Sequence, residues 1–398
     1  MNNPILSRAW AIVHTDKLKN NIKSIKNYIG NEKKLMAVVK ADAYGHGFCE
    51  VAKVAVENGA DYLAVACIEE AKQIRKIGIH TPILILGATP LDCVSDLFEY
   101  DIIPTVFENE LPEAISRYAK ETNKSLKVHV KVDTGMGRIG FQYYGDNDES
   151  GIDNIIKISK MQGIEIEGIF THFACADEEN GHEITEKQFS DFMYVIEKLN
   201  KNNIHIQIRH CANSAAICCY KKMHLDMVRA GIILYGEYPS KYIKENTTLE
   251  IEPVMELKST VSQIKTVKKG TGISYGHNYK AVKDEEKLAV VCIGYADSYY
   301  RSLSGKTKVI INGKFARQVG NICMDQMVVD IDGIEDVHYG TEVTLVGREK
   351  DTVITFSDIA EIIGTINYEI MSDMSKRVVR SYFDKDKLVN VVNYLEKM

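Results

Sequence analysis

The 398-residue chain lacks the runs that mark membrane and nucleic-acid-binding proteins. No stretch of about eighteen apolar residues occurs, and no basic region followed by an apolar one opens the sequence. The net charge is -6, acidic and basic residues are interspersed, and there is no long basic run. We therefore expect a cytoplasmic protein that acts on a small molecule and binds neither nucleic acid nor a membrane.

Paired cysteines are also lacking. The nine cysteines are an odd number, mostly in apolar contexts, and none forms a Cys-x-x-Cys pair. This pattern favours reduced, buried thiols over a disulfide framework. His46 with Cys49, and His172 with Cys175, have the spacing of metal-ligand pairs, but two ligands are too few for a zinc site. We predict no metal.

No linker rich in Pro and Ser and no low-complexity segment divides the chain, although it is longer than one core usually supports. In its first part, short apolar runs alternate with stretches of helical spacing, and the alternation implies parallel strands. The strand candidates are 35–39, 62–67, 82–86, 102–106, 126–132, 165–170, 204–208 and 225–229. They predict a (β/α)8 TIM barrel over residues 15–245, with Thr15 as N-cap of its first helix and Gly30 as the stop.

After residue 245 the pattern changes to period-two alternation, as in Met255–Ile264 and Leu288–Ile293. The sequence predicts an α/β protein whose barrel is followed by a mostly antiparallel β domain over residues 246–398. One short capped helix is expected at 355–364. Residues 1–14 contain an apolar strand ahead of the barrel, which we expect to join the β domain.

Lys40 lies where an apolar strand gives way to a glycine-punctuated turn, in Ala37-Val-Val-Lys-Ala-Asp-Ala-Tyr-Gly-His-Gly47. Functional side chains of a barrel enzyme lie at the carboxyl ends of its strands. Burial lowers the pKa of an ammonium group and frees the amine for Schiff-base formation, so Lys40 is the candidate nucleophile. Taken alone, its position also fits a solvated lysine that happens to follow a strand.

The fifth strand candidate ends in Gly135-x-Gly137-x-x-Gly140, the spacing of a dinucleotide-binding loop. Such a loop must open a helix, whereas the stretch 141–150 is rich in turn residues. We therefore set aside a dehydrogenase.

Two segments near the last strands of the barrel are rich in small residues. They are His210-Cys-Ala-Asn-Ser-Ala-Ala216 and Val228-Arg-Ala-Gly-Ile-Ile233. Together they predict a phosphate cradle, with Ser214, Gly231 and Ile232 as the contacts. His172 ends the sixth strand candidate, where it is either a site residue beside Lys40 or a satisfied core histidine.

These segments resemble, in the same order and over nearly the whole chain, those of the alanine racemases, which are fold-type III pyridoxal-phosphate enzymes. The resemblance implies that Lys40 carries pyridoxal 5'-phosphate and that Arg229 faces its ring nitrogen. A permanently charged arginine keeps that nitrogen unprotonated, which weakens the electron sink and favours return of a proton over decarboxylation or transamination. The other cofactor-binding residues implied are Tyr44, His172, Asn213, Ser214, Gly231, Ile232 and Tyr368.

Racemisation needs an acid or base on both faces of Cα, and Lys40 serves one of them. The resemblance makes Tyr275, in Gly272-Ile-Ser-Tyr-Gly276, the second base, reaching the active site of the other subunit of a homodimer. It would need cationic neighbours, for which His172 and Arg229 are candidates. On the residues alone, Tyr275 could equally be a turn tyrosine beside a glycine.

Further roles follow from the same resemblance. Arg138 engages the substrate, and Lys131 is a lysine often carbamylated to an anion that positions Arg138. The alternative for Lys131 is an ion pair with Asp133. The Met324 backbone meets the substrate carboxylate, with Cys323 and Asp325 beside it, although Ile322–Gln326 would otherwise read as an ordinary strand.

Tyr295 and Tyr368 resemble the entrance gate, or are core-packing aromatics. The chain departs from the family at three positions, with Ser298 for glycine, Asn321 for arginine and Val379 for proline. The Asn321 change bears on the electrostatics of the entrance.

The expected reaction is interconversion of L-alanine and D-alanine, which supplies D-alanine for peptidoglycan, by a two-base mechanism. A racemase of serine or of broader specificity is the nearest alternative, and a bulky Tyr368 at the gate favours the methyl side chain. A decarboxylase of this fold type would place an acidic residue where Arg229 stands. A non-catalytic carrier of pyridoxal phosphate would be a lone barrel, without the extra β domain.

Overall fold

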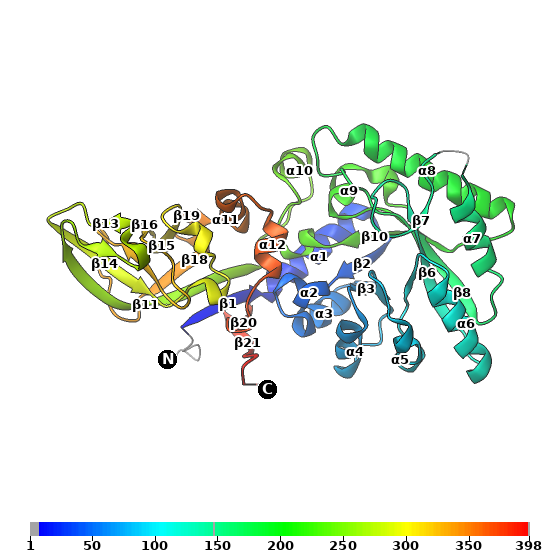
Figure 1. Ribbon diagram of the computed structural model, residues 1–398, viewed down its shortest axis with the longest axis horizontal. Coiled ribbons are helices and arrows are strands. Elements are labelled where there is room, and N and C mark those ends of the chain that lie inside the picture. Colours follow the sequence, from blue (N-terminus) through cyan, green and yellow to red (C-terminus); the bar gives the residue numbers. More distant parts are fainter. Residues whose placement is uncertain (1–7, 146–147, 397–398) are drawn as a thin grey trace. The chain divides into compact units, whose positions relative to one another are not determined.

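The computed structural model describes residues 8–145 and 148–396, which divide into two compact units. Residues 18–43 and 48–252 form the first, here the barrel unit. The described residues 8–17, 44–47 and 253–396 form the second, here the β unit. Each unit is coloured by sequence in Figure 1.

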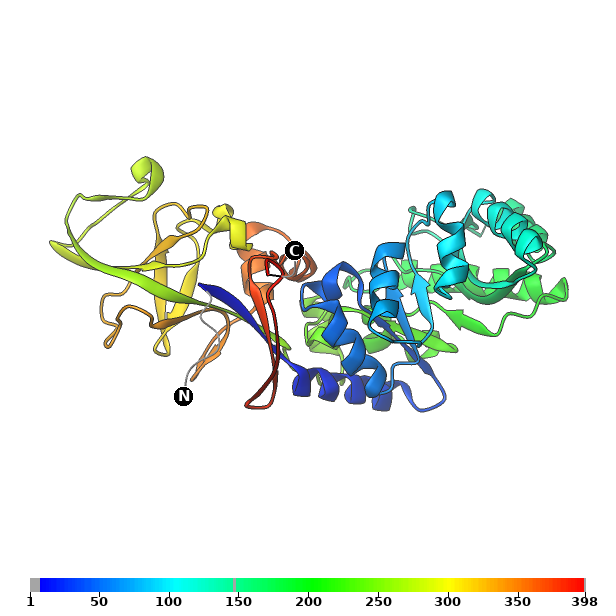
Figure 2. The same ribbon diagram turned by 90° about the horizontal axis from the view of Figure 1, so that it is seen from below.

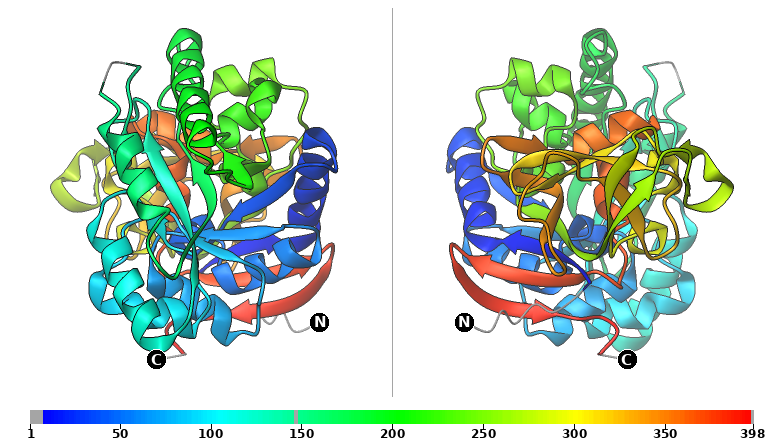
Figure 3. Two further views of the ribbon diagram at one scale, coloured as in Figure 1. Left: turned by 90° about the vertical axis from the view of Figure 1, so that its right-hand side faces the viewer. Right: turned by 90° about the vertical axis from the view of Figure 1, so that its left-hand side faces the viewer.

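Among the described residues, eight parallel strands of the barrel unit form a ring, with helices around them (Figure 3, left view). The strands are β2 (Lys34–Val38), β3 (Tyr62–Val65), β4 (Ile83–Ile85), β5 (Thr105–Val106), β6 (Leu126–Asp133), β8 (Ile164–Phe170), β9 (Ile208–His210) and β10 (Met227–Ala230). Parallel ladders join β10-β2-β3-β4 and β5-β6-β8-β9. A bridge between Leu84 and Ile103 and the bond from Asp226 N to Arg209 O at 3.1 Å connect the two groups into a ring.

Helices follow most of the barrel strands along the chain. They are α1 (Thr15–Ile29), α3 (Phe48–Glu57), α4 (Ile68–Lys76), α5 (Val94–Glu99), α6 (Glu110–Thr122), α7 (Ser150–Ile158), α8 (His182–Lys201), α9 (Ser214–Cys219) and α10 (Lys241–Asn246). In α1, Leu18, Ile22 and Ile25 are fully buried, as their helical spacing predicts. Gly30, at φ 85°, ends this helix in the left-handed region.

Two local predictions in the barrel are wrong. Thr15 does not cap α1 but is its first residue, and its hydroxyl donates to the carbonyl of Phe383 at 2.9 Å. The seventh strand lies at Ile208–His210 instead of 204–208, because the Ile204 amide donates to Leu199 O in the turn that ends α8. Alternation of isoleucines at 204, 206 and 208 has the period of a strand, but within this segment only the residues from Ile208 onward pair with β8.

The β unit is built on a ten-stranded sheet among the described residues, in the order β19-β18-β15-β16-β17-β14-β11-β1-β20-β21. β1 (Ala9–His14) is antiparallel to β11 and parallel to β20. The other strands are β11 (Met255–Lys268), β14 (Glu285–Val291), β15 (Lys308–Ile311), β16 (Lys314–Val319), β17 (Met327–Asp330), β18 (Glu342–Glu349), β19 (Thr352–Ile354), β20 (Val379–Asp384) and β21 (Lys387–Val392). The long strand β11 is prominent in yellow-green in Figure 2. The predicted barrel followed by a mostly antiparallel β domain is confirmed.

Smaller elements complete the β unit. The predicted helix at 355–364 is confirmed as α11 (Phe356–Ile363), capped by the Thr355 side chain, with Asp358 completing a capping box. A second helix, α12 (Asn367–Ser372), and the hairpin of β12 (Gly272–Ile273) and β13 (Tyr279–Lys280) were not anticipated. Among the described residues, no helix has both the length and the apolar character needed to cross a membrane.

Gly45 is expected to tolerate no side chain. A Cβ there would overlap the carbonyl oxygen of Met371, and its φ of 79° already disfavours any L-residue. Gly78 is the matched control, because it has a similar φ of 82° and a Cβ added there would meet nothing within 4 Å. Gly45→Ala should lower the free energy of unfolding by about 2 kcal/mol or more beyond Gly78→Ala. Equal thermal shifts for the two variants would contradict the overlap.

Candidate active site in the barrel

Lys40 follows β2 and begins α2 (Lys40–Tyr44), whose residues 41–44 all have φ 53° and therefore form a left-handed turn. This conformation costs about 1–2 kcal/mol per residue, so its surroundings must hold it. The Ala41 amide donates to Glu70 Oε1 at 2.7 Å, and Asp42 Oδ1 accepts from the Phe48 amide at 3.0 Å. The turn therefore fixes the position of Lys40 at the carboxyl end of its strand.

The environment of Lys40 favours the neutral amine. Burial and then the positive charge of Arg138 lower the pKa of the Lys40 ammonium group, while Glu70 opposes them. A lysine with a lowered pKa presents more free amine at neutral pH. The solvated-lysine alternative does not fit this environment.

Arg229, on β10, is 4% exposed and bonded at both terminal nitrogens. Nη1 meets His210 Nδ1 at 3.0 Å, and Nη2 donates to Thr171 O at 2.9 Å and meets His172 Nδ1 at 3.2 Å. Its Nε–H makes no hydrogen bond with any described residue. Burial lowers the pKa of Arg229 to about 10, so the group stays charged at neutral pH and has one donor left for a ligand.

His172 does not supply the positive charge expected of it. Burial, and next the charge of Arg229, hold the pKa of His172 well below its usual range. The ring is therefore neutral near pH 7, and Arg229 takes its Nδ1 as a partner at 3.2 Å. Two residues were expected to supply positive charge for the second base. Of these, only Arg229 is charged near pH 7.

Lys131, on β6, is 2% exposed, and its Nζ donates to Val132 O at 2.8 Å. Burial and then the charge of Arg229 lower the pKa of Lys131 to about 7. Within the described residues Lys131 forms no ion pair with Asp133, so that alternative is not seen.

The glycines with dinucleotide-like spacing surround a carboxylate of their own chain. Asp133 Oδ1 accepts from the amides of Gly135 at 3.0 Å, Met136 at 2.9 Å and Gly137 at 3.1 Å. Gly140 is followed by the short strand β7 (Phe141–Gln142) instead of a helix. The loop that carries Arg138 is therefore not a nucleotide-binding loop.

The predicted phosphate contacts come together between α9 and β10. The Ser214 hydroxyl accepts from the Gly231 amide at 3.0 Å, and Asn213 caps α9 through its bond from the Ala216 amide. The Ile232 amide, which begins a 3-10 turn (Ile232–Tyr235), donates to no acceptor within the described residues. A buried donor without a partner beside a hydroxyl suits an anionic group. No cluster of three or more metal-ligating side chains occurs in the described part of the chain.

Tyr275, Tyr295 and Met324 all belong to the β unit and are exposed, at 72%, 42% and 52%. Met324 lies in a loop and not in a strand, and its carbonyl accepts from the Ala296 amide at 3.0 Å. Exposure of Tyr295 is contrary to the core-packing alternative. The ring of Tyr368 lies 6.1 Å from that of Tyr44, also in the β unit, between centroids.

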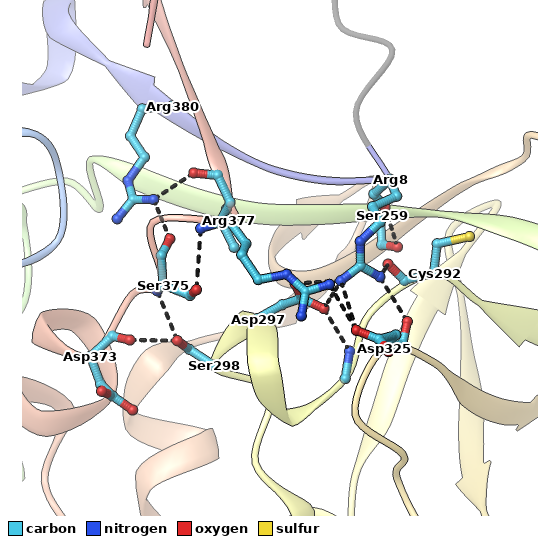
Figure 4. Close-up of polar contacts among 12 residues, drawn as sticks. Arg8, Ser259, Cys292, Asp297, Ser298, Asp325, Asp373, Ser375, Arg377 and Arg380 are labelled. Carbon is cyan, nitrogen blue, oxygen red and sulfur yellow. Dashed lines mark hydrogen bonds and ion pairs between the residues drawn. The ribbon is translucent and has the colours of Figure 1, made fainter. Parts of the chain in front are cut away.

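Two arginines tie the loops that bear Tyr295 and Met324 (Figure 4). Arg8 donates to the Asp297 carboxylate and to Asp325 O at 2.8 Å, and Arg377 Nη2 donates to Asp325 Oδ1 at 2.7 Å. Asp297 is 1% exposed and its Oδ2 accepts from the Gly294 amide at 3.0 Å. Asp325 thus acts through ion pairs within the β unit, and the sequence did not indicate Arg8 or Arg377 as its partners.

The departure at Ser298 has a local explanation. Its φ of 69° is one that glycine adopts without strain and that costs a serine conformational energy. The serine hydroxyl donates to Asp373 O and accepts from the Ser375 amide at 2.8 Å (Figure 4). These bonds offset the conformational cost.

A network of buried polar side chains continues from Arg229, and the sequence did not predict it. His210 Nε2 lies 2.9 Å from His129 Nδ1, and His129 Nε2 lies 3.4 Å from Glu167 Oε2. Glu167 also accepts from Lys127 at 2.6 Å. The sequence did contain a signal for this network, namely polar residues within otherwise aliphatic barrel strands. The hydrogen bonds connect Arg229 through His210 and His129 to Glu167.

Comparisons with known proteins show the family of this chain. The family profiles "Alanine racemase, N-terminal domain" and "Alanine racemase, C-terminal domain" match residues 13–239 and 254–382. The chain is 45% identical to the alanine racemase of Clostridium tetani, over 98% of this chain and 99% of that one. It is 44% identical to that of Clostridium perfringens, over 97% and 98%.

Solved structures give the same result. The alanine racemase of Clostridium difficile 630 aligns with a TM-score of 0.92 at 43% identity, covering 98% of this chain and 100% of that one. The alanine racemase of Bacillus anthracis with bound L-Ala-P aligns with a TM-score of 0.92 at 38% identity, covering 99% and 100%. Because both profiles match and these relatives align over nearly the full length of both chains, this chain belongs to the alanine racemase family.

Proposed function

We propose that the protein interconverts L-alanine and D-alanine with pyridoxal 5'-phosphate bound through Lys40. The observation that carries the proposal is the setting of Lys40 and Arg229 in one barrel: a lysine of lowered pKa, and a buried arginine with one donor left over. The Ser214 hydroxyl and the Ile232 amide suit the phosphate. When bound, the cofactor withdraws electrons from Cα and makes its proton removable.

The residues of the chain would divide the work as follows. Lys40 holds the cofactor and moves the proton at Cα on one face, and the Tyr275 hydroxyl does so on the other. Arg229 would face the ring nitrogen, and its charge would keep that nitrogen unprotonated. Arg138 and the Met324 backbone orient the substrate carboxylate. Tyr44, Ser214, Gly231 and Ile232 would hold the phosphate, Asn213 would support them, and His172 would lie beside the ring.

We further propose a cytoplasmic homodimer with shared active sites, whose product D-alanine serves peptidoglycan. The barrel domain would extend over residues 15–245. The β domain would extend over 246–398 and include the strand in residues 1–14. Support for sharing comes from the exposure of Tyr275 and Met324 in the single chain. Tyr295 and Tyr368 would narrow the entrance to an alanine-sized side chain.

A stereochemical assay tests the proposed reaction. Purified protein loaded with pyridoxal phosphate and given L-alanine should produce D-alanine until the two are equal. L-Serine tested in parallel measures the nearest alternative specificity. Faster turnover of serine than of alanine would assign the chain to that alternative, and no racemisation of either would leave only a cofactor carrier.

Lys40 should be the attachment point. Borohydride reduction of the loaded protein, followed by peptide mapping, is expected to place the pyridoxyl group on Lys40, because its lowered pKa makes it the reactive amine. Lys131, with a pKa lowered to about 7, is the internal competitor. A label on Lys131 or on another lysine would refute the assignment.

Lys131 should be carbamylated. A carbamate forms from neutral amine and carbon dioxide, and a pKa of about 7 leaves half of Lys131 neutral at that pH, a fraction that rises as pH rises. The resulting anion would lie near Arg138 and Arg229. ¹³C-bicarbonate should give a carbamate resonance that is absent in Lys131→Gln. If the unmodified chain gave no carbamate resonance at pH 8, Lys131 would be an unmodified lysine of the barrel.

A further inference from the structure

We propose that Asn321 and Ser274 are positioning residues for Tyr275, joining the segment that carries it to the segment that carries Met324. This inference rests on the proposed function, because it concerns the aim of the proposed second base. The set of bonds between residues 274–275 and 321–323 is here called the clasp. All of its members lie in the β unit.

Tyr275 has little packing of its own. Its side chain is 72% exposed, and it lies at the tip of the β12–β13 hairpin, which is joined by two residue pairs, Gly272 with Lys280 and Ile273 with Tyr279. The base of the hairpin is fixed, because fully buried Glu286 accepts from the Tyr279 hydroxyl and from the Val282 amide at 2.9 Å. The position of the tip must therefore come from the backbone around Tyr275.

That backbone is strained and is held from outside the hairpin. Ser274 has φ 62° and ψ -174°, a region occupied essentially by glycine, at a cost of about 1–3 kcal/mol. Its hydroxyl donates to Asn321 O at 2.5 Å and lies 3.3 Å from Cys323 Sγ. A strained residue immediately before Tyr275 thus depends on a bond to the neighbouring loop.

Asn321 completes the clasp from the other side. Its Nδ2 donates to the carbonyl of Tyr275 at 2.6 Å, while its own carbonyl accepts from Ser274. Backbone contact is also close, since a Cβ at Gly320 would lie 2.7 Å from Ile273 O. Met324 follows Asn321 by three residues. The clasp therefore joins the segment that carries the Tyr275 hydroxyl to the segment that carries the proposed carboxylate contact. The asparagine that replaces the family's usual arginine has this specific partner.

The test compares Asn321→Asp and Ser274→Ala with the unmodified enzyme. Asn321→Asp keeps the shape of the side chain but loses the N–H donor, and Ser274→Ala removes the other bond. Hydrogen exchange of the peptide covering residues 272–280, measured on the full chain, should become faster by about tenfold or more in both variants. The control Asn246→Ala removes a similar bond, to Tyr242 O at 2.9 Å in α10, and should leave this peptide unchanged.

Kinetics separate positioning from general destabilisation. Each variant should lower kcat for alanine by about tenfold, because a displacement near 1 Å can cost up to about 10²-fold. In the Tyr275→Phe background the same changes should cause no further loss, since their effect passes through the tyrosine hydroxyl. Losses that multiply in the double variants, or unchanged exchange at 272–280, would overturn the proposal. If the unmodified enzyme failed to racemise alanine, the proposed function would fall, whereas the exchange data would still report on the clasp.

Discussion

Tyr275→Phe is expected to slow alanine racemisation by about 10²-fold or more while leaving pyridoxal phosphate attached to Lys40. The factor is the usual contribution of a positioned acid or base, and the substitution removes one oxygen and no packing surface. Because Tyr275 is 72% exposed, the lost hydroxyl should not affect folding. The rate in both directions should fall together, since the overall equilibrium between the enantiomers is fixed.

Tyr339→Phe is the matched control for this experiment. Tyr339 is 82% exposed in the same β unit and has no part in the proposed site. Absorbance of the bound cofactor and the thermal midpoint should be the same in both variants, and only Tyr275→Phe should lose racemisation. Near-normal turnover by Tyr275→Phe would remove the tyrosine from the proton transfer and leave the second face of Cα without an assigned base.

Periodicity allowed the architecture to be predicted, because it records which side of each element is buried. The alternation of strands and helices gave the barrel, and the change to period two after residue 245 gave the antiparallel sheet. Its limits appear at Ile204, whose pattern is that of a strand but whose amide completes the turn after α8. Strand pairing depends on which residues of the neighbouring strand are positioned to form hydrogen bonds. The sequence of a single segment does not contain that information.

The charge states of the site residues and the left-handed backbone conformation after Lys40 were harder to predict from the sequence. Residues Ala41 to Tyr44 contain no glycine, yet all adopt φ 53°, held by bonds that include one to Glu70, about thirty positions away. His172 was expected to be cationic, but burial beside Arg229 keeps it neutral. Both features arise from tertiary neighbours. Residue identities point to a site, and three-dimensional contacts determine its charge state.

Mixing Lys40→Ala chains with Tyr275→Phe chains should restore activity that neither variant has alone. The barrel unit contains Lys40, Arg138 and Arg229, whereas Tyr275 and Met324 belong to the β unit. If two-fold pairing delivers the tyrosine of each chain to the barrel of its partner, a heterodimer has one site with both defects and one intact site. Each parent homodimer has two defective sites.

The size of the recovery distinguishes the two arrangements. Random exchange of equal amounts gives half of the dimers as heterodimers, and one of their two sites is intact, so about a quarter of the unmodified activity should return. The rate of recovery should follow the rate of subunit exchange, measured by native mass spectrometry of a mass-labelled chain. If each chain instead supplied Tyr275 to its own barrel, every site in the mixture would lack either Lys40 or Tyr275. Heterodimers confirmed by mass but without activity would therefore mean that each chain builds its site alone, and that the exposed Tyr275 turns toward its own Lys40.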